Sequence, residues 1–332
     1  MEELVFFINK VLVSGVVLGS VYALGAVGIT LIFGILRFAH FAHGDMMTAG
    51  GFISLILAGA ATSIGLQTGW PTGFIVLPLA LPLTALLALG LDRAFYQPLR
   101  ARGAKPVTLL IASIGVTLML QGVIRLFFGA EGQNFFETEP KEIFRIPFPG
   151  AGRPITVSEP QMLLVGATVL AVFALHLFLT RSRLGKGMRA MADNAALAQV
   201  SGINTAQVIR ATWIIAGGLA GLAGTMLALD VSLKPDMAFN IILPIFAAAI
   251  VGGLGHSYGA IAGGFLVGFA ETIAVFNWTT VLRPFAGYLP FGWQFPADLS
   301  VVPSEYKLSV AFVILVVVLL FRPTGIFKGA ST

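Results

Sequence analysis

The sequence contains no cysteine and few charged residues. Without a thiol at any of its 332 positions, the chain cannot form disulfide bonds or thiolate metal sites. Only 11% of its residues are charged, whereas a soluble domain usually carries about 25%. A chain with so little charge cannot cover its surface in water, and this excludes an ordinary soluble domain.

Sequence motifs of nucleotide hydrolysis and metal catalysis are absent as well. The nearest approach to a phosphate-binding loop is LGKG at 184–187, which lacks the upstream glycine and the hydroxyl residue of that motif. The sequence contains no HExxH pattern and no GxSxG pattern. We therefore expect no enzymatic activity, no cofactor, no metal ion and no nucleic-acid partner for this chain.

Apolar residues are abundant instead, at 57% of the chain with a mean hydropathy of +0.92. Several apolar runs reach the ~20 residues that cross a bilayer. The candidate spans lie near 10–36, 46–64, 73–92, 107–128, 161–180, 211–230, 241–254, 260–276 and 308–321. The sequence therefore predicts an all-α polytopic membrane protein with eight to nine transmembrane helices in one domain over 1–332. The start, MEELVFFINK, has no signal-peptide features, so we expect the first span to be retained.

The basic residues are unevenly distributed between the two sets of connections. Twelve of the 20 Lys and Arg residues lie in one alternating set, which comprises 37–45, 93–106, 181–210 and 322–332. The positive-inside rule places this set in the cytoplasm and the amino terminus outside. If the stretch 37–47 enters the membrane without crossing it, the amino terminus lies inside instead.

Two long connections are predicted on the external side, at 129–160 and 277–307. The second contains aromatic residues of the kind that gather at membrane interfaces, namely Trp278, Tyr288, Trp293 and Tyr306. Both connections are compatible with plain surface loops. Docking of an external partner is the alternative.

The segment RFAHFAHGDMM at 37–47 places ionisable residues between two apolar runs. Gly44 and Asp45 precede an apolar stretch, which is typical of a helix start with Asp45 as the cap. Polar residues at membrane depth are costly and therefore suggest function. We interpret Phe41, His43, Gly44 and Asp45, together with Glu271 in a later span, as candidates for a substrate pathway. The alternative is that Asp45 only caps a helix and that His43 only packs.

Glycines recur at close intervals near the end of the chain, a spacing that allows helix backbones to touch. The candidates for helix packing are Gly255, Gly259, Gly263, Gly264 and Gly268. Glycine-interrupted blocks at 34–51 and 252–268 lie in opposite halves of the chain. Such a pair points to broken or re-entrant helices around a central pathway. For the packing glycines, the alternative is chance spacing in a glycine-rich membrane protein.

The basic loop at 181–210 is predicted to contain an amphipathic helix. Met188, Met191, Ala195 and Ala198 fall at helical spacing, which predicts a helix over about 187–200. Gly202 can end it in the left-handed conformation, and Asn204 with Gln207 resembles a cap for the next span. Such a helix fits either a cytoplasmic protein partner or the lipid head groups.

Three stretches resemble membrane subunits of bacterial ABC importers of the branched-chain amino-acid and ribose type. They are GSVYALGAVGITLIFGILRFAHFAHGDMMTAGGF at 19–52, GKGMRAMADNAALAQVSGINT at 185–205 and VGGLGHSYGAIAGGFLVGFAE at 251–271. Within that group the chain looks most like the H-type permease subunits for branched-chain amino acids. One difference is His40, which stands where we expect Asn.

The resemblance implies a permease subunit of an ATP-driven importer in the bacterial inner (plasma) membrane, for branched-chain or other hydrophobic amino acids. Its partners would be a second related permease subunit, two cytoplasmic ABC ATPases and a periplasmic solute-binding protein. The 181–210 loop would act as the coupling helix, and the residues implied in ATPase coupling are Gly187, Arg189, Asn194, Ala195, Ala198, Gly202 and Asn204. The alternatives are a permease for urea, an amide or another small polar solute, a stand-alone channel, and a proton-coupled secondary transporter.

Overall fold

The computed structural model describes residues 1–66, 69–137, 140–284 and 295–327. In these ranges eight helical stretches are long and apolar enough to cross a membrane, and a shorter apolar helix, α12, joins them. The spans are Glu2–Leu36, His43–Ser63, Leu77–Ala101, Pro106–Phe128, Glu159–Arg181, Thr205–Asp230, Ser257–Val275 and Ser304–Phe321. The predicted all-α membrane architecture is confirmed.

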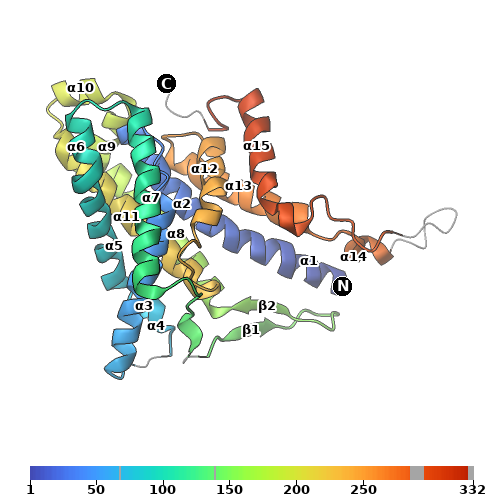
Figure 1. Cartoon of the computed structure of the whole chain (residues 1–332). Helices are drawn as coiled ribbons and strands as arrows, with labels where there is room; N and C mark the ends of the chain where they lie inside the picture. The colour runs from blue at the N-terminus through green and yellow to red at the C-terminus, as the bar shows by residue number, and fades with distance from the viewer. Residues whose placement is uncertain (67–68, 138–139, 285–294, 328–332) are drawn as a thin grey trace.

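Helices make up most of the described chain, and Figure 1 shows their arrangement. The helices are α1 (Glu2–Phe7), α2 (Ser14–Leu36), α3 (His43–Ser63), α4 (Thr72–Ile75), α5 (Leu77–Leu91), α6 (Gln97–Ala101), α7 (Pro106–Phe128), α8 (Glu159–Arg181), α9 (Arg183–Asp193), α10 (Ala195–Val200), α11 (Thr205–Asp230), α12 (Phe239–Gly252), α13 (Ser257–Val275), α14 (Thr279–Leu282) and α15 (Lys307–Phe321). Short π-helical stretches at Ile8–Val13 and Asp92–Tyr96 join α1 to α2 and α5 to α6. The two strands are β1 (Ile143–Ile146) and β2 (Ile155–Ser158).

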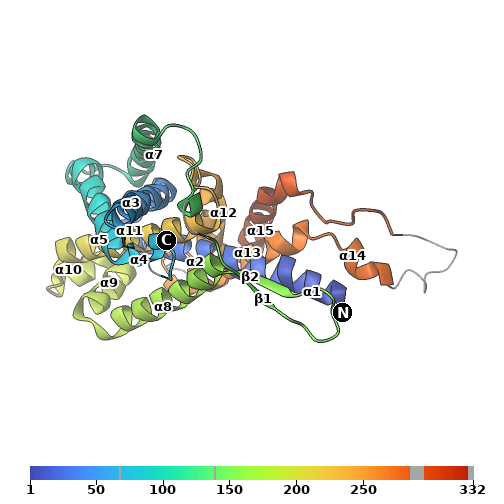
Figure 2. The same cartoon turned by 90° about the horizontal axis from the view of Figure 1, so that it is seen from below.

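Helix α2 forms the centre of the bundle. Seen from below, it lies between α3 and α7 on one side and α8 on the other (Figure 2). Nearly all of its residues from Gly19 to Ile35 are buried. The outer helices instead expose large apolar side chains, including Leu86, Leu126, Phe127, Leu170, Phe173 and Phe321. Exposed apolar surface on this scale fits a lipid environment.

The glycines of α13 pack against two different helices. A Cβ atom added at Gly264 or Gly268 would collide with the backbone of α2 at Ala23 or Gly19. One added at Gly259 or Gly263 would collide with the backbone of α12. The predicted series therefore divides into two faces of one helix.

Gly255 does not belong to that helix. It lies in the turn before α13, with a φ of +87°, and its Cα is 3.4 Å from the position of a Cβ added at Gly34. The predicted helical ladder from 255 to 268 is therefore wrong at its first member. The reason is that His256 caps α13, through Nδ1 accepting from the N–H of Gly259 at 3.1 Å.

The amino terminus lies on the same side as the β1–β2 hairpin, which belongs to the predicted external connection 129–160. Strands β1 and β2 pair in antiparallel fashion. Asn9 bridges to this hairpin, donating to Pro154 O at 3.2 Å and accepting from the N–H of Thr156 at 3.0 Å. In Figure 1 the hairpin and the amino terminus lie at the end of the molecule opposite α6, α9 and α10. This arrangement agrees with an external amino terminus.

The connection 277–307, which is predicted to be external, is described only in part. Trp278 packs edge-on against Phe276, with ring centroids 5.3 Å apart, and lies 6.0 Å from the ring of Phe7. Tyr306 ends a short 3-10 helix just before α15. Tyr288 and Trp293, which were expected in the interface belt, lie outside the described residues.

Candidate functional site

Two interrupted segments meet in the middle of the bundle. Helix α2 ends at Leu36 and α3 begins at His43, while α11 ends at Asp230 and α12 begins at Phe239. The N-terminal ends of α3 and α12 touch, because the N–H of Ala238, the residue before α12, donates to Thr48 Oγ1 in the second turn of α3 at 3.2 Å. The second interruption, at 231–238, precedes α12, whereas the sequence pointed to the 252–268 block.

Small and aromatic residues fill this junction. A Cβ atom added at Gly44 would lie 3.0 Å from Ala238 O and 3.2 Å from Ile242, so the lack of a side chain at this position favours the close approach of the two helix starts. The rings of Phe41 and Phe246 lie 4.7 Å apart. The amide of Phe41 donates to Ser113 Oγ of α7 at 3.1 Å, which satisfies one backbone group of the break.

Arg37 joins the break to the predicted cytoplasmic loop at 181–210. It ends α2 with a φ of +56°, the only positive φ at a non-glycine position among the described residues. Its guanidinium Nη2 donates to the backbone oxygen of Ala192 in α9 at 2.5 Å. A side chain in this backbone conformation is strained, and such strain often marks a functional position.

Two histidines of the break are fully buried. His40 Nε2 and the Tyr96 hydroxyl are 3.0 Å apart, in hydrogen-bond contact, and Tyr96 stacks on Trp213 with ring centroids 5.3 Å apart. His43 packs on Gly28 of α2, and its two ring nitrogens have no hydrogen-bond partner among the described residues. His43 therefore does not satisfy the first amides of α3.

Asp45 does not cap α3, contrary to the sequence prediction. The helix begins two residues earlier, at His43, and no side chain caps it. Asp45 lies in the first turn, 1% exposed, and accepts a hydrogen bond from Gln121 Nε2 of α7 at 2.9 Å. Its negative charge still stabilises the positive end of the α3 dipole.

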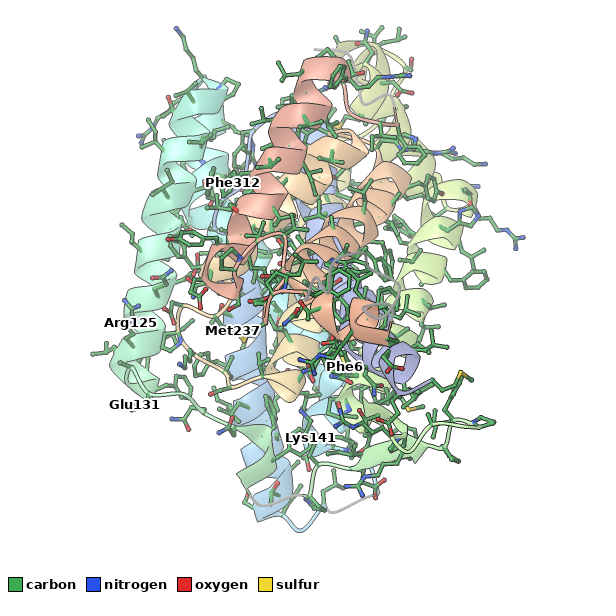
Figure 3. All side chains as sticks on the ribbon, turned by 90° about the vertical axis from the view of Figure 1, so that its right-hand side faces the viewer. Phe6, Arg125, Glu131, Lys141, Met237 and Phe312 are labelled. Atoms are coloured by element: carbon green, nitrogen blue, oxygen red, sulfur yellow. The ribbon has the colours of Figure 1, made fainter. Side chains whose placement is uncertain are left out.

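The partners of this site on α7 were missed by the sequence reasoning. They form a polar stripe with one residue per helical turn, Ser113, Thr117, Gln121 and Arg125. The positive charge of Arg125 also attracts the Asp45 carboxylate, and Figure 3 labels Arg125 on α7 and Met237 in the α11–α12 connection. The signal was present in the sequence, because a four-residue polar period inside an apolar run marks a helix face turned to protein.

Glu271 belongs to a different cluster. Its side chain is fully buried on α13, and Oε2 accepts from the Tyr22 hydroxyl at 2.9 Å and lies 3.7 Å from Lys307 Nζ. The partners of Asp45 all lie on α7. The structure therefore gathers Phe41, Gly44 and Asp45 around the helix break and places Glu271 elsewhere.

The predicted helix over 187–200 is in fact two helices. Asn194 leaves the helical conformation and caps α10, accepting from the N–H of Leu197 at 3.0 Å. Gly202 has a φ of +84° and closes α10 as predicted, with the Ile203 N–H donating to Ala198 O at 3.1 Å. The capping role predicted for Asn204 is confirmed, because it accepts from the N–H of Gln207 at 3.1 Å.

The two helices turn different residues inward and outward. Gly187, Met188, Met191 and Ala198 are buried within the chain. Arg189, Asn194 and Ala195 are exposed. Leu197 and Val200 are also exposed, at 63% and 86%. The outer surface of α10 is therefore apolar and uncovered.

Comparison with known proteins identifies the family of the chain. Residues 11–319 match the family described as branched-chain amino acid transport system / permease component. The chain belongs to this family. As a permease component it has a transport role and not an enzymatic one, and it is a multi-pass protein of the bacterial inner membrane.

The branched-chain amino acid permeases match over almost the whole chain. The high-affinity branched-chain amino acid transport system permease protein LivH of Escherichia coli K12 is 30% identical over 338 residues, covering 98% of this chain and 96% of that protein. The corresponding protein BraD of Pseudomonas aeruginosa is 31% identical over 327 residues, covering 98% and 97%. The ribose import permease protein RbsC of Escherichia coli K12 is 28% identical over 257 residues, covering 75% and 73%. No solved structure matches the chain.

Proposed function

We propose that this permease is a membrane subunit of an ATP-driven importer and that it carries branched-chain or other hydrophobic amino acids. A periplasmic solute-binding protein would deliver the solute, a second related permease would complete the pathway, and two cytoplasmic ABC ATPases would drive transport. The named functions of LivH and BraD support the solute class.

The observation that carries the proposal is the meeting of the α3 and α12 starts inside the bundle. Broken helices at membrane depth are tolerated where they line a pathway, and their positive ends face charged groups of a substrate. The solute carboxylate would be attracted by these helix starts. Asp45 offers the opposite charge for its ammonium group, and Phe41 and Phe246 supply apolar contact beside it.

The α9–α10 unit is suited to transmit the movement of an ATPase. Its outer surface carries Ala195, Leu197 and Val200, while α9 packs inward on α2 and α8. Arg37 connects the end of α9 with the start of the break. A displacement of α9–α10 would therefore be transmitted to the helix break by Arg37, through its side chain and its strained backbone.

Reconstitution tests this proposal directly. The permease is assembled with a candidate second permease, two ATPases and a binding protein in proteoliposomes, and uptake of radiolabelled L-leucine is measured with ATP. We expect ATP-dependent uptake that stops when the binding protein is omitted. Ribose and urea serve as comparison solutes. Transport of L-leucine by the permease without ATPases would contradict the proposal and favour a channel.

A further inference from the structure

A second site lies apart from the helix break. An open cavity of about 320 Å³ is lined by α1 and the adjoining π-helix, the first residue of α2, the end of α13 and the start of α15. Figure 3 labels Phe6, the residue of α1 that forms part of its wall. The volume lies at the lower end of the range of about 300–1,000 Å³ that is typical of small-molecule pockets.

A carboxylate beside the cavity has one oxygen with no hydrogen-bond donor among the described residues. Glu271 lines the cavity and its side chain has no exposed surface. Tyr22 and Lys307 both approach Oε2, whereas Oε1 has no partner among the described residues. A buried carboxylate oxygen without a donor is costly. An ammonium group from a ligand would satisfy it.

Two lysines complete the charge pattern. Lys307 lies 3.7 Å from Glu271, too far for a short hydrogen bond, and is partly exposed. Lys10 lines the same cavity, is exposed, and forms no ion pair with the rest of the described chain. Both ammonium groups can receive an anion. The walls around these three charges are largely apolar and include Phe6 and Phe276.

The cavity lies at the level expected for the external membrane interface. It is formed by chain segments that adjoin the external hairpin and the 277–307 connection. Trp278 packs beside it on Phe276 and Phe7, and tryptophan is enriched at this depth. Lipid head groups and external solutes can both reach such a position.

We propose that this cavity binds a zwitterionic group, whose ammonium contacts Glu271 Oε1 and whose acidic group contacts Lys10 and Lys307. Two sources share this chemistry. One is an aminoethyl-phosphate lipid headgroup of the outer leaflet, and the other is a free amino acid. Because the site is separate from the helix break, its test does not require transport.

The purified full chain is tested with two pairs of probes. Phosphatidylethanolamine is compared with phosphatidylglycerol, which lacks the ammonium, by native mass spectrometry of lipids retained from an equal mixture. L-Leucine is compared with 4-methylpentanoate, which also lacks the ammonium, by isothermal titration calorimetry. We expect at least one zwitterion to bind at least tenfold more tightly than its partner probe, and the arm that responds identifies the source.

Variants locate the binding in the cavity. Glu271→Gln removes the charge but can still accept a hydrogen bond from Tyr22, and Lys10→Gln changes an exposed residue that the fold does not need. Each is expected to weaken zwitterion binding by roughly tenfold. Lys105→Gln, at an exposed lysine outside the cavity, is the matched control.

Two results overturn the proposal. The first is that neither zwitterion binds, or that the probes without an ammonium bind equally well. The second is that Glu271→Gln and Lys10→Gln bind like the Lys105→Gln control. The melting temperature without probe shows whether each variant is folded, and if Glu271→Gln does not fold, Lys10→Gln decides.

Discussion

At the scale of single residues, the hydrogen bond between Gln121 and Asp45 links α7 to the helix break. Gln121→Leu would leave the buried Asp45 carboxylate without its donor, at a cost of about 1–3 kcal/mol. We expect a lower melting temperature for the purified permease. Adding Asp45→Leu should recover most of this loss, because both polar partners are then removed. A double variant as unstable as Gln121→Leu alone would show that the bond is not the source of the effect.

Replacement of the Asp45 carboxylate distinguishes a role of Asp45 in the substrate pathway from a purely structural role. Asp45→Asn keeps a side chain that can accept from Gln121 but removes the charge. We expect assembly at the normal level and L-leucine uptake reduced by about tenfold or more, since the ammonium of the solute loses its counter-charge. Initial uptake rates in proteoliposomes measure this. Uptake at the wild-type rate would show that Asp45 is not part of the substrate pathway and has a role in packing only.

Arg37 offers a test of mechanical coupling. Arg37→Gly and Arg37→Ala both remove the contact with Ala192, so both should hydrolyse ATP with weaker coupling to uptake. Only Arg37→Gly relieves the left-handed backbone, which costs other residues roughly 1–2 kcal/mol. The glycine variant should therefore melt at a higher temperature than the alanine variant. Uptake per ATP equal to wild type in both variants would exclude the coupling role.

At the scale of elements, the two faces of α13 hold the bundle together through backbone contact. A Cβ atom added at Gly268 would lie 2.6 Å from Gly19 N, whereas a Cβ atom added at Gly122 of α7 would have no neighbouring atom within 4 Å. Gly268→Val should push α13 from α2 and cost about 1–3 kcal/mol. Gly122→Val has the same effect on helix propensity and should be tolerated. Melting temperatures of the two purified variants make the comparison.

Helix α10 is where we expect the ATPase to dock. Ala195→Glu adds volume and a charge to its exposed apolar surface. An unpaired charge at a buried interface should cost roughly 2–5 kcal/mol, a loss of about 30-fold or more in affinity. The ATPase should be lost in a pull-down while the permease still inserts. Ala104→Glu, in the α6–α7 connection, is the control. Equal recovery of the ATPase with both variants would contradict docking at α10 and favour the interpretation that α9–α10 lies on the lipid head groups.

The sequence could predict the spans and the first break, because bilayer thickness imposes a minimum length and ionisable residues interrupt the apolar run at 37–47. The division of the 181–210 segment at Asn194 was missed, although Asn favours helix N-caps over helix interiors and so gave a local signal. The pairing of Asp45 with Gln121 was out of reach. It joins residues 76 positions apart, and one sequence shows the polar face of α7 without showing what it faces.

At the scale of the whole molecule, the fold and the charge distribution agree on orientation. The loops at α6 and α9–α10 share the end of the molecule that carries the excess of Lys and Arg. The amino terminus lies at the opposite end, held by Asn9 to the hairpin. A re-entrant 37–47 segment would reverse the amino terminus alone, so the labelling of that terminus is the decisive measurement.

Single cysteines can report this orientation without background, because the chain has none of its own. We expect Glu2→Cys and Glu131→Cys to react with an impermeant maleimide added outside right-side-out vesicles. Arg102→Cys should react only after the membrane is opened, since it lies between α6 and α7 at the cytoplasmic end. All three positions are exposed, so access to the reagent depends on the side of the membrane. Labelling of Glu131→Cys from outside with Glu2→Cys protected would mean that α2 and α3 do not both cross, and the helix break would then be a re-entrant loop rather than a junction between two spans.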